Sequence, residues 1–434
     1  MTRPETVSPA RRRAVIDALR RGTVPGAGLD LFAVGLEQFE NALDGELDTV
    51  ATGNAQFKAL RGEYGSGKTF FARWLAERAK RRHMATAEIQ ISETETPLHK
   101  LETVYRRLVE HLATSAHQPS ALRDIIEGWF YILEEDALEA NPIEDPDELA
   151  RAVDTLAEQR LASVARSTPA FSAALRAYRR ARLDGEDALA EGLLAWIGGQ
   201  PNVSAMVKRA AGVKGDLDHF GALGFLQGLL TVLRDSGHPG LLVVLDEIET
   251  LQRARSDVRE KSLNALRQLM DEIDQGRFPG LYLLITGTPA FFDGTQGIQR
   301  APALAQRLAA DFGDPRFDNP KAVQIRLHGF DLDKLRLLGE AVRDLYAVGA
   351  SERVTTLVDD DFIAELARAV TGGLGGQVGI APRLFLRKLV DVLDRVDQFE
   401  DFDPRLHYRL TLRSGELTET ERNAASAEDV DLQL

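Results

Sequence analysis

Cysteine is absent from the 434 residues of this chain. Without thiols there is no disulfide framework, no thiolate nucleophile and no zinc site built on cysteine. Lysine is scarce as well, since only ten of the 53 basic residues are lysines, and 67 acidic residues bring the formal net charge to −14. Because this excess of negative charge repels nucleic acid on average, any contact with DNA needs a local basic patch.

Apolar runs long enough for a signal peptide or a membrane-spanning helix are also absent. Arginines gather near the N-terminus, at Arg11 to Arg13, but no apolar segment of signal-peptide length follows them. We therefore expect a cytoplasmic protein with no membrane partner. A composition of 44% hydrophobic and 28% charged residues is typical of soluble globular proteins, and the length allows two or three domains.

Hydrophobic periodicity predicts an α/β fold with a parallel sheet covered on both faces. Continuous apolar or β-branched runs indicate strands, and spacings of three and four indicate helices. The predicted strands are 57–61, 85–92, 241–245, 281–285 and 323–327; the predicted helices are 12–21, 34–49, 70–82, 258–274, 331–346, 360–370 and 381–396.

The stretch between the second and third predicted strands contains only helical patterns, which predicts a long all-helical insertion. The chain is expected to divide into a first core part at 1–97, the insertion at 98–236, a second core part at 237–328, a helical lid at 329–411 and a polar tail at 412–434. We expect the tail to be disordered, because it is acidic and poor in apolar residues.

A phosphate-binding motif lies between the first predicted strand and the helix that follows it. Gly62-Glu63-Tyr64-Gly65-Ser66-Gly67-Lys68-Thr69 fits the pattern G-x-x-x-x-G-K-T without a mismatch. The glycines let backbone N–H groups surround an anion, and the helix N-terminus adds further donors. Lys68 is predicted to reach the β- and γ-phosphates of ATP, and the Thr69 hydroxyl to bind Mg²⁺. A glycine-rich turn with a solvated lysine is the alternative.

Two carboxylates follow the most apolar strand. Leu241 to Leu245 is continued by Asp246 and Glu247, at the carboxyl edge of the sheet where open α/β sheets bind ligands. Asp246 is predicted to hold Mg²⁺, and Glu247 to activate the attacking water. Acidic residues after a strand can also serve as helix caps, so this signal depends on the motif upstream. A third carboxylate nearby, Glu249, is expected to be solvated.

Together these motifs resemble the AAA+ superfamily of P-loop ATPases, in particular the branch of origin-recognition and Cdc6-like initiators. The resemblance implies a three-layer core and a C-terminal helical lid. It further implies that Thr286, after the strand 281–285, senses the γ-phosphate, although a threonine can simply cap a turn before proline.

The same resemblance implies an arginine finger that reaches a neighbouring subunit. Arg307 lies about where that residue falls, Arg300 is its rival, and an ordinary surface arginine remains an alternative. Arg383, in Gly379-Ile380-Ala381-Pro382-Arg383, matches the second sensor of the lid. Val24 and Pro25 match the segment that packs on adenine, where a simple turn between helices is the alternative.

A narrower resemblance is carried by Arg61 to Phe71, which includes Phe70 directly after the motif, by Ser92 to His99 and by Gly22 to Pro25. These segments are similar to the ATP-binding proteins of bacterial BREX bacteriophage-exclusion systems. That resemblance implies phage defence in an assembly with DNA-acting partners. No winged-helix pattern follows the lid, which leaves the DNA-reading module of the initiator branch in doubt.

The sequence thus predicts a Mg²⁺-dependent ATPase that works as a homo-oligomeric ring or filament and remodels or loads a DNA-acting partner. The alternative is a nucleotide-gated switch with little turnover that signals through its insertion. Direct DNA binding would rest on the arginine clusters 78–82 and 176–182, the latter with Tyr178, whose helical spacing favours solvated faces. We therefore expect contact with DNA to be indirect.

Overall fold

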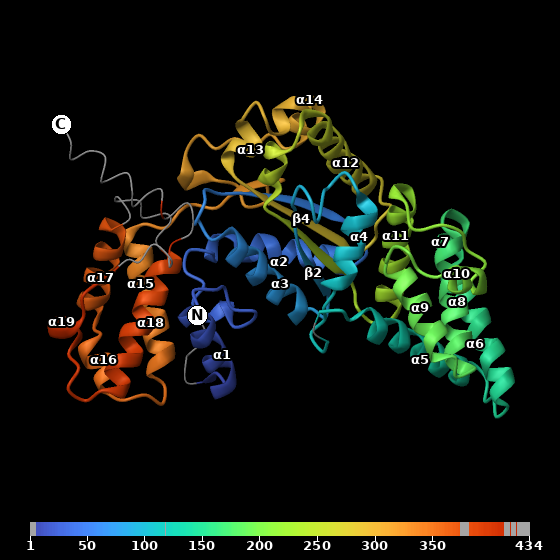
Figure 1. The fold of residues 1–434 in the computed structure, drawn as a ribbon, viewed down its shortest axis with the longest axis horizontal. Helices are drawn as coiled ribbons and strands as arrows, with labels where there is room; N and C mark the ends of the chain where they lie inside the picture. The colour runs from blue at the N-terminus through green and yellow to red at the C-terminus, as the bar shows by residue number, and fades with distance from the viewer. Residues whose placement is uncertain (1–5, 118, 374–381, 412–416, 418–421, 423–434) are drawn as a thin grey trace.

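The computed structural model of the chain describes residues 6–117, 119–373, 382–411, 417 and 422. A five-stranded parallel sheet lies at its centre (Figure 1). The strands are β1 (Gln56–Arg61), β2 (Ala85–Gln90), β3 (Leu241–Asp246), β4 (Leu281–Gly287) and β5 (Gln324–Arg326), in the order β2-β3-β4-β1-β5. The predicted α/β class is confirmed, and each predicted strand is present within two residues of its expected ends.

Helices cover both faces of the sheet because successive residues of each strand point to opposite sides. On one face, Val243 and Leu283 pack in a core with the insertion and the helix after β3. On the other face, Val244 and Leu284 pack in a second core with the N-terminal and C-terminal helices. Since β3 and β4 are buried along their whole length, their sequences are continuously apolar rather than alternating.

The N-terminal segment forms helices around the predicted glycine and proline turn. They are α1 (Pro9–Arg20), the short 3₁₀ helix Leu29–Leu31, α2 (Glu37–Ala51) and, after β1, α3 (Lys68–Arg81). The first helix begins three residues before its predicted start, because the Ser8 side chain accepts from the Arg11 amide and Pro9 occupies the first turn.

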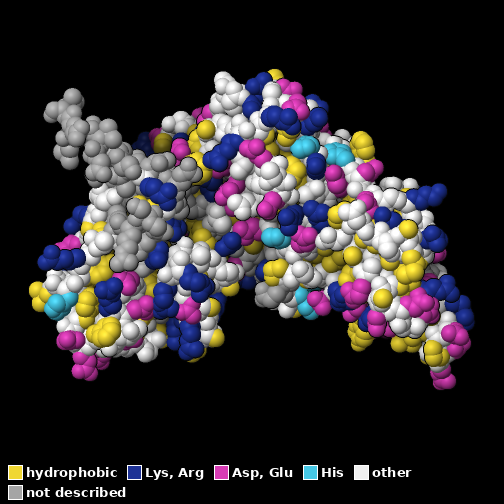
Figure 2. All heavy atoms as spheres, viewed as in Figure 1, with side chains coloured by type: hydrophobic (Ala, Val, Ile, Leu, Met, Phe, Trp, Pro, Cys, Tyr) yellow, Lys and Arg dark blue, Asp and Glu magenta, His cyan; other side chains and the backbone are white. Residues whose placement is uncertain are grey.

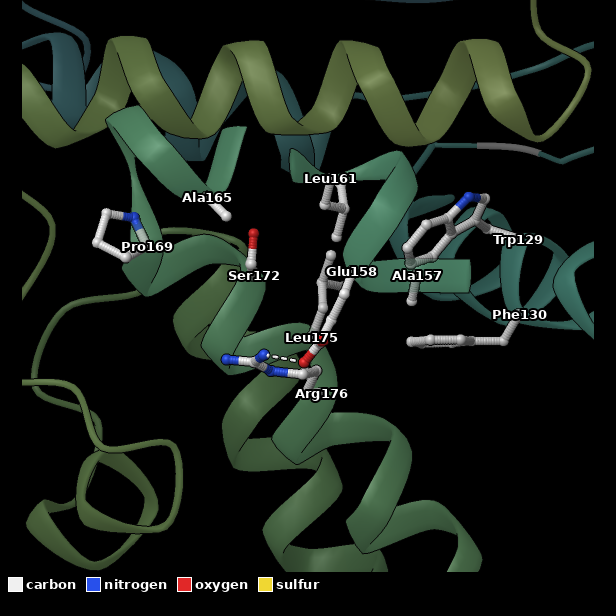
Figure 3. Close-up of a pocket in the computed structure, with 10 residues that line it drawn as sticks. All are labelled: Trp129, Phe130, Ala157, Glu158, Leu161, Ala165, Pro169, Ser172, Leu175 and Arg176. Atoms are coloured by element: carbon white, nitrogen blue, oxygen red, sulfur yellow. Dashed lines mark hydrogen bonds and ion pairs between the residues drawn. The ribbon is translucent and has the colours of Figure 1, made fainter. Parts of the chain in front are cut away.

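Between β2 and β3 the described residues form helices only, as predicted, apart from one isolated antiparallel bridge that joins Thr86 to Ala113. The helices are α4 (Leu101–Glu110), α5 (Leu122–Ala140), α6 (Pro146–Arg160), α7 (Ala162–Ser167), α8 (Pro169–Leu183), α9 (Asp187–Ile197), α10 (Ala205–Ala210) and α11 (His219–Asp235). A cavity of about 280 Å³ lies among α5, α6 and α8, beside an ion pair of Glu158 with Arg176 at 2.6 Å (Figure 3).

The second half of the chain completes the sheet and adds a helical unit. After β3 come the 3₁₀ helix Ile248–Arg253 and α12 (Ser256–Asp274); after β4 come α13 (Pro289–Asp293), α14 (Pro302–Arg307) and the 3₁₀ helices Ile298–Arg300 and Pro315–Phe317. The C-terminal helices are α15 (Leu332–Ala347), α16 (Arg353–Leu357), α17 (Asp360–Gly372), α18 (Pro382–Gln398) and α19 (Pro404–His407).

The C-terminal helices lie beside α1, at the opposite end of the sheet from the insertion (Figure 1). The predicted lid helices correspond to α15, α17 and α18, although residue 381 and most of the predicted tail lie outside the described residues. None of the helices in the described ranges has the length and apolar character needed to cross a membrane.

Candidate functional site

The sheet register brings polar residues of three strands to one edge. Gln90 pairs with Asp246, and Leu245 pairs with Ile285, so Asp246 and Thr286 continue side by side at the carboxyl ends of β3 and β4. Strand β1 runs next to β4 and leads into the glycine-rich loop. The predicted loop, carboxylates and sensor threonine therefore meet at the ligand-binding edge of an open parallel sheet.

The loop from Gly62 to Thr69 has a backbone that its glycines make accessible. Gly65 and Gly67 have φ angles of 78° and 94°, in the left-handed region that other residues rarely adopt. At Gly62 there is no room for a side chain, because a Cβ atom would collide with the Ser66 hydroxyl. Helix α3 begins at Lys68, two residues earlier than predicted, because Gly67 provides its N-cap.

Lys68 is folded onto the loop. Its Nζ donates to the carbonyl oxygens of Gly62 at 2.9 Å and Glu63 at 3.2 Å, and the side chain is buried. Burial lowers the pKa of Lys68, while the carboxylates of Glu249 and Asp246 act in the opposite direction. The Ser66 hydroxyl is also buried and has no hydrogen-bond partner within the described residues. A buried cation and an unsatisfied donor fit a bound anion.

Asp246 is the centre of a hydrogen-bonded cluster. The Thr69 hydroxyl donates to its Oδ2 at 3.0 Å, and the Thr286 hydroxyl donates to its Oδ1. The Glu247 amide also donates to Oδ1, at 3.0 Å. The two predicted Mg²⁺ ligands, Thr69 and Asp246, thus lie in contact. Since the described residues include no cluster of three or more potential ligand side chains, a cation here would need phosphate or water oxygens, as Mg²⁺ sites commonly do.

Glu247 has a constrained backbone and a fixed side chain. Its φ of 58° lies in the left-handed region, which is uncommon for a residue with a side chain and is typical of functional sites. The Gln90 amide donates to Glu247 Oε2 at 2.7 Å. The sequence analysis did not identify Gln90 as a site residue. The signal that could have found it is the one used for Thr286, namely a polar residue at the end of a parallel strand.

Glu249 is buried, and the expectation that it is solvated was wrong. Only 5% of its surface is exposed, and neither carboxylate oxygen has a hydrogen-bond partner in the described residues. The short 3₁₀ helix after β3 turns this side chain inward. Burial raises the pKa of Glu249, and Lys68 partly offsets this effect.

A cavity of about 340 Å³ adjoins these groups. Its lining includes Val24 and Pro25, the loop residues Tyr64 to Phe70, and Arg383 at the second position of α18. The residues Gly379 to Ala381 that precede Arg383 lie outside the described ones. The C-terminal half contributes side chains that the sequence did not single out, namely His328, Phe330, Lys334, Leu338 and Leu386.

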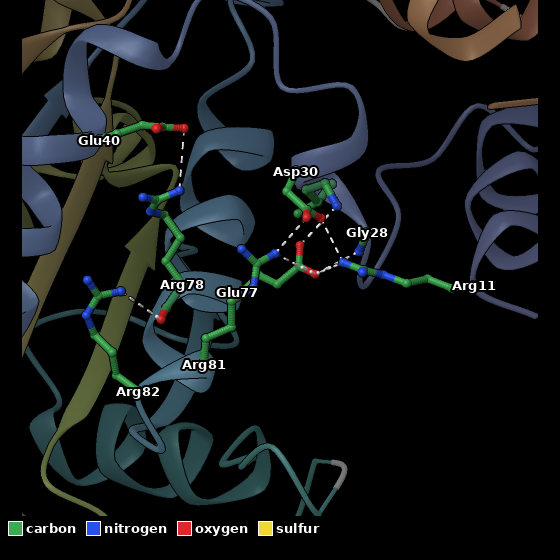
Figure 4. A network of polar contacts seen from close by, with 9 residues as sticks. Arg11, Gly28, Asp30, Glu40, Glu77, Arg78, Arg81 and Arg82 are labelled. Carbon is green, nitrogen blue, oxygen red and sulfur yellow. Dashed lines mark hydrogen bonds and ion pairs between the residues drawn. The ribbon is translucent and has the colours of Figure 1, made fainter. Parts of the chain in front are cut away.

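The N-terminal segment is fastened to α3 by a polar network (Figure 4). Glu77 accepts from the amides of Gly28 at 3.0 Å and Leu29 at 2.9 Å, and from the Arg11 guanidinium at 2.7 Å. Arg73 of the same helix donates to the Val24 carbonyl oxygen at 2.9 Å. These contacts hold Val24 against the helix that begins at Lys68.

Neither finger candidate lines the cavity. Arg307, the last residue of α14, forms ion pairs with Asp271 and Asp274 of α12 in the same chain. Arg300 donates to Gln296 at 3.3 Å and lies 3.9 Å from Glu260. Both arginines therefore face α12 or its surroundings in the single chain.

The two arginine clusters considered for DNA are neutralised within the chain. In the first, Arg78 and Arg82 pair with Asp44 of the N-terminal segment. Arg81 pairs with Asp30 of the same segment (Figure 4). In the second, the ion pairs are Arg176–Glu158, Arg179–Asp154, Arg180–Asp184 and Arg182–Asp187. The Tyr178 ring is buried, and its hydroxyl donates to Glu127. Arg81, Arg176, Arg180 and Arg182 are nevertheless exposed, so these faces are solvated, as the helical spacing predicted, and each arginine also has an acidic partner.

A glycine-rich phosphate loop at the carboxyl edge of a parallel sheet, beside a threonine and aspartate pair, defines a P-loop nucleotide-binding protein. The chain belongs to the family of BREX system ATP-binding proteins BrxC/D, which matches residues 7–412. The predicted membership of this ATP-binding phage-defence family is confirmed.

No curated protein matches the chain. Among solved structures, one that is similar is that of the Aeropyrum pernix ORC2 protein in ADPNP-ADP complexes, with 14% sequence identity and a TM-score of 0.40 over 89% of this chain and 67% of that chain.

Proposed function

We propose that this ATP-binding protein hydrolyses ATP with the help of Mg²⁺ and uses the energy within a BREX-type defence assembly, to remodel or load a DNA-acting partner. The observation that carries the proposal is the contact of Thr69 with Asp246, next to Glu247 and the buried Lys68. A simple nucleotide-binding site does not need a second carboxylate at this position.

Each residue of the site has a role that follows from its chemistry. Lys68 and the loop amides bind the phosphates. Thr69 and Asp246 would hold Mg²⁺, which when bound would neutralise charge on the phosphate oxygens. Thr286 keeps Asp246 in place through its hydroxyl. Arg383, on the cavity wall, contributes a second positive charge, and Val24 and Pro25 offer an apolar surface for adenine.

Glu247 is the general base in this proposal. It orients the attacking water and accepts its proton. The Gln90 amide occupies Oε2 of this carboxylate, so Oε1 is the oxygen left to accept from water.

The same hydrogen bond favours a second function, that of a nucleotide-gated switch. If Gln90 keeps Glu247 inactive until a partner binds, the chain holds ATP for long periods and signals through the helices of its insertion. The two functions differ in basal turnover.

The test of hydrolysis is a steady-state ATPase assay of Glu247→Gln and Lys68→Ala against the unaltered chain, with calorimetry of ATP binding. We expect Glu247→Gln to keep its affinity and to lose turnover by about 10²–10⁴-fold, the usual contribution of a general base. Lys68→Ala should lose ATP binding. Equal, near-zero rates in the unaltered and Glu247→Gln chains would favour the switch, and unchanged ATP affinity in Lys68→Ala would refute the site.

Gln90→Ala separates the two functions further. Because a hydrogen bond to a charged group contributes about 1.5 kcal/mol or more, its removal should raise the basal ATPase rate by roughly tenfold if Gln90 restrains Glu247. Gln56→Ala, at the opposite end of the sheet, is the matched control. A lower rate in Gln90→Ala would mean that Gln90 orients the base rather than restraining it.

A further inference from the structure

Basic side chains from three separate segments surround an open polar cavity of about 420 Å³, away from the nucleotide site. Its lining includes His99 from the segment before α4, His219 at the start of α11, and Lys261 and Arg267 on α12. Lys100 lies next to His99 and is exposed. On the face shown in Figure 2, histidine and Lys or Arg side chains lie close together in the region of α12.

The cations of this surface differ from the arginine clusters described above because they are not neutralised. Within the described residues, the side chains of Lys100, Lys261 and Arg267 form no ion pair and no hydrogen bond with another protein group, and all three residues are exposed. Asp271, the acidic residue in the lining, is already paired with Arg307. A free positive field of this kind is unusual in a chain with a net charge of −14.

Lys100 and Lys261 both lie close enough to His99 to influence its ionisation. The pKa of His99 is lowered, first by burial and then by the charges of Lys100 and Lys261, while Glu102 and Asp257 act more weakly in the opposite direction. Buried His99 Nδ1 has no hydrogen-bond partner in the described part of the chain. Like charges held together without partners are a common feature of sites that bind phosphate groups.

An aromatic side chain stands exposed beside these cations. Phe220, the second residue of α11, is 74% exposed, and its ring packs edge-on against the His219 ring with centroids 5.4 Å apart. A large apolar ring costs free energy in water, so its exposure next to a basic cavity suits a partner that offers a flat apolar face. Nucleobases offer such a face, and stacking of one base on an aromatic side chain contributes about 1–3 kcal/mol.

We propose that His99, Lys100, His219, Phe220, Lys261 and Arg267 form a binding surface for single-stranded nucleic acid. The three unpaired cations contact successive phosphates, and Phe220 stacks on a base. An acidic peptide would satisfy the cations but not the exposed ring, and duplex DNA keeps its bases stacked inside. None of the residues of this surface lines the nucleotide cavity, so substitutions here remove no direct contact with ATP.

The test is fluorescence anisotropy with a labelled oligothymidine over a range of salt concentrations. Lys261→Ala with Arg267→Ala should weaken binding at least tenfold. It should also reduce the slope of log K against log salt by about 1.4, since each phosphate contact on a single strand contributes about 0.7. Phe220→Ala should weaken binding about tenfold, because the loss of one base stacked on the ring costs about 1.4 kcal/mol. The slope of log K against log salt should not change, since the ring carries no charge.

The matched control is Arg166→Ala with Arg209→Ala, which removes the same charge from exposed positions elsewhere on the insertion. ATP affinity, measured on every variant, reports whether the fold is intact. Equal binding by both double variants would overturn the proposal. The proposal would also be overturned if duplex DNA and oligothymidine bound with equal affinity and Phe220→Ala affected neither. A third contrary outcome is displacement of oligothymidine by polyglutamate at equal charge concentration.

Discussion

Glu249 is the residue whose environment departs most from what its sequence position suggested. A carboxylate without hydrogen-bond partners in a buried site is costly when charged, so its pKa is raised by burial. The folded chain therefore holds a proton at pH values where the unfolded chain has lost it. The resulting stability is present below the ordinary carboxyl pKa and is lost as the pH rises through the raised value.

This linkage predicts the behaviour of Glu249→Gln. The variant should unfold at higher denaturant concentration than the unaltered chain at pH values above the raised pKa, and the difference should vanish in acid. It should also bind ATP more tightly at neutral pH, because the charged Glu249 carboxylate repels the phosphates. Bound phosphate raises the pKa of Glu249 further, and each unit of that rise corresponds to about 1.4 kcal/mol, or about tenfold in ATP affinity.

Urea unfolding and calorimetry at several pH values measure both effects. Exposed Glu37→Gln, on α2, removes the same charge outside the cavity and should show neither. If Glu249→Gln bound ATP more weakly than the unaltered chain, the carboxylate would instead contribute directly to the nucleotide site.

At the scale of elements, α3 connects the phosphate loop to the N-terminal segment. Its first residue is Lys68, and Glu77, about two and a half turns further on, accepts hydrogen bonds from two backbone amides and the Arg11 guanidinium. The segment that carries Val24 and Pro25 contains no helix or strand between the end of α1 and residue 29. Its position beside the cavity therefore depends on side chains of α3.

Glu77→Ala should lower the free energy of unfolding by about 2 kcal/mol, since a hydrogen bond to a charged group contributes about 1.5–3 kcal/mol. ATP affinity should fall as well, because only the fraction of molecules with an ordered N-terminal segment is competent to bind. Urea unfolding and calorimetry measure the two quantities.

The control for this variant is Glu40→Ala, whose carboxylate contacts Arg78 at 3.5 Å and bonds no backbone amide within the described ranges. An affinity loss of equal size in both variants would mean that general charge, and not the fastening of this segment, controls binding.

At the scale of the whole molecule, the proposed arginine finger predicts that a second chain completes the site. Arg307 can serve a neighbouring subunit only if its ion pairs with Asp271 and Asp274 open. If it does so, Arg307→Ala should lower turnover by about 10³-fold or more with ATP affinity unchanged, as expected for an arginine finger.

The control here is Asp271→Ala with Asp274→Ala, which breaks the same ion pairs and keeps the arginine, so its turnover should persist. Light scattering with and without ATP should detect the assembly that a finger requires. A particle that stays monomeric at saturating ATP, or a loss of turnover in Arg300→Ala instead, would exclude Arg307 from this role.

The sequence by itself determined the strands, the phosphate loop and the identity of the carboxylates. These features depend on local chemistry: glycines permit the left-handed backbone of the loop, and continuous apolar residues mark strands buried on both faces. Thr69, Asp246 and Thr286 could be named because each follows directly from the end of a strand or a motif.

Only the tertiary structure decided which distant side chains meet. Gln90 reaches Glu247 because β2 and β3 are neighbours in register, and Glu249 is buried because a 3₁₀ turn redirects it. The arginines of 78–82 and 176–182 are close in sequence and are neutralised by partners brought near in space. Lys100 is far in sequence from Lys261 and Arg267 of α12, yet the three side chains lie unpaired on one surface. Charge acts through distance in space, and distances between segments are set by packing rather than by order along the chain.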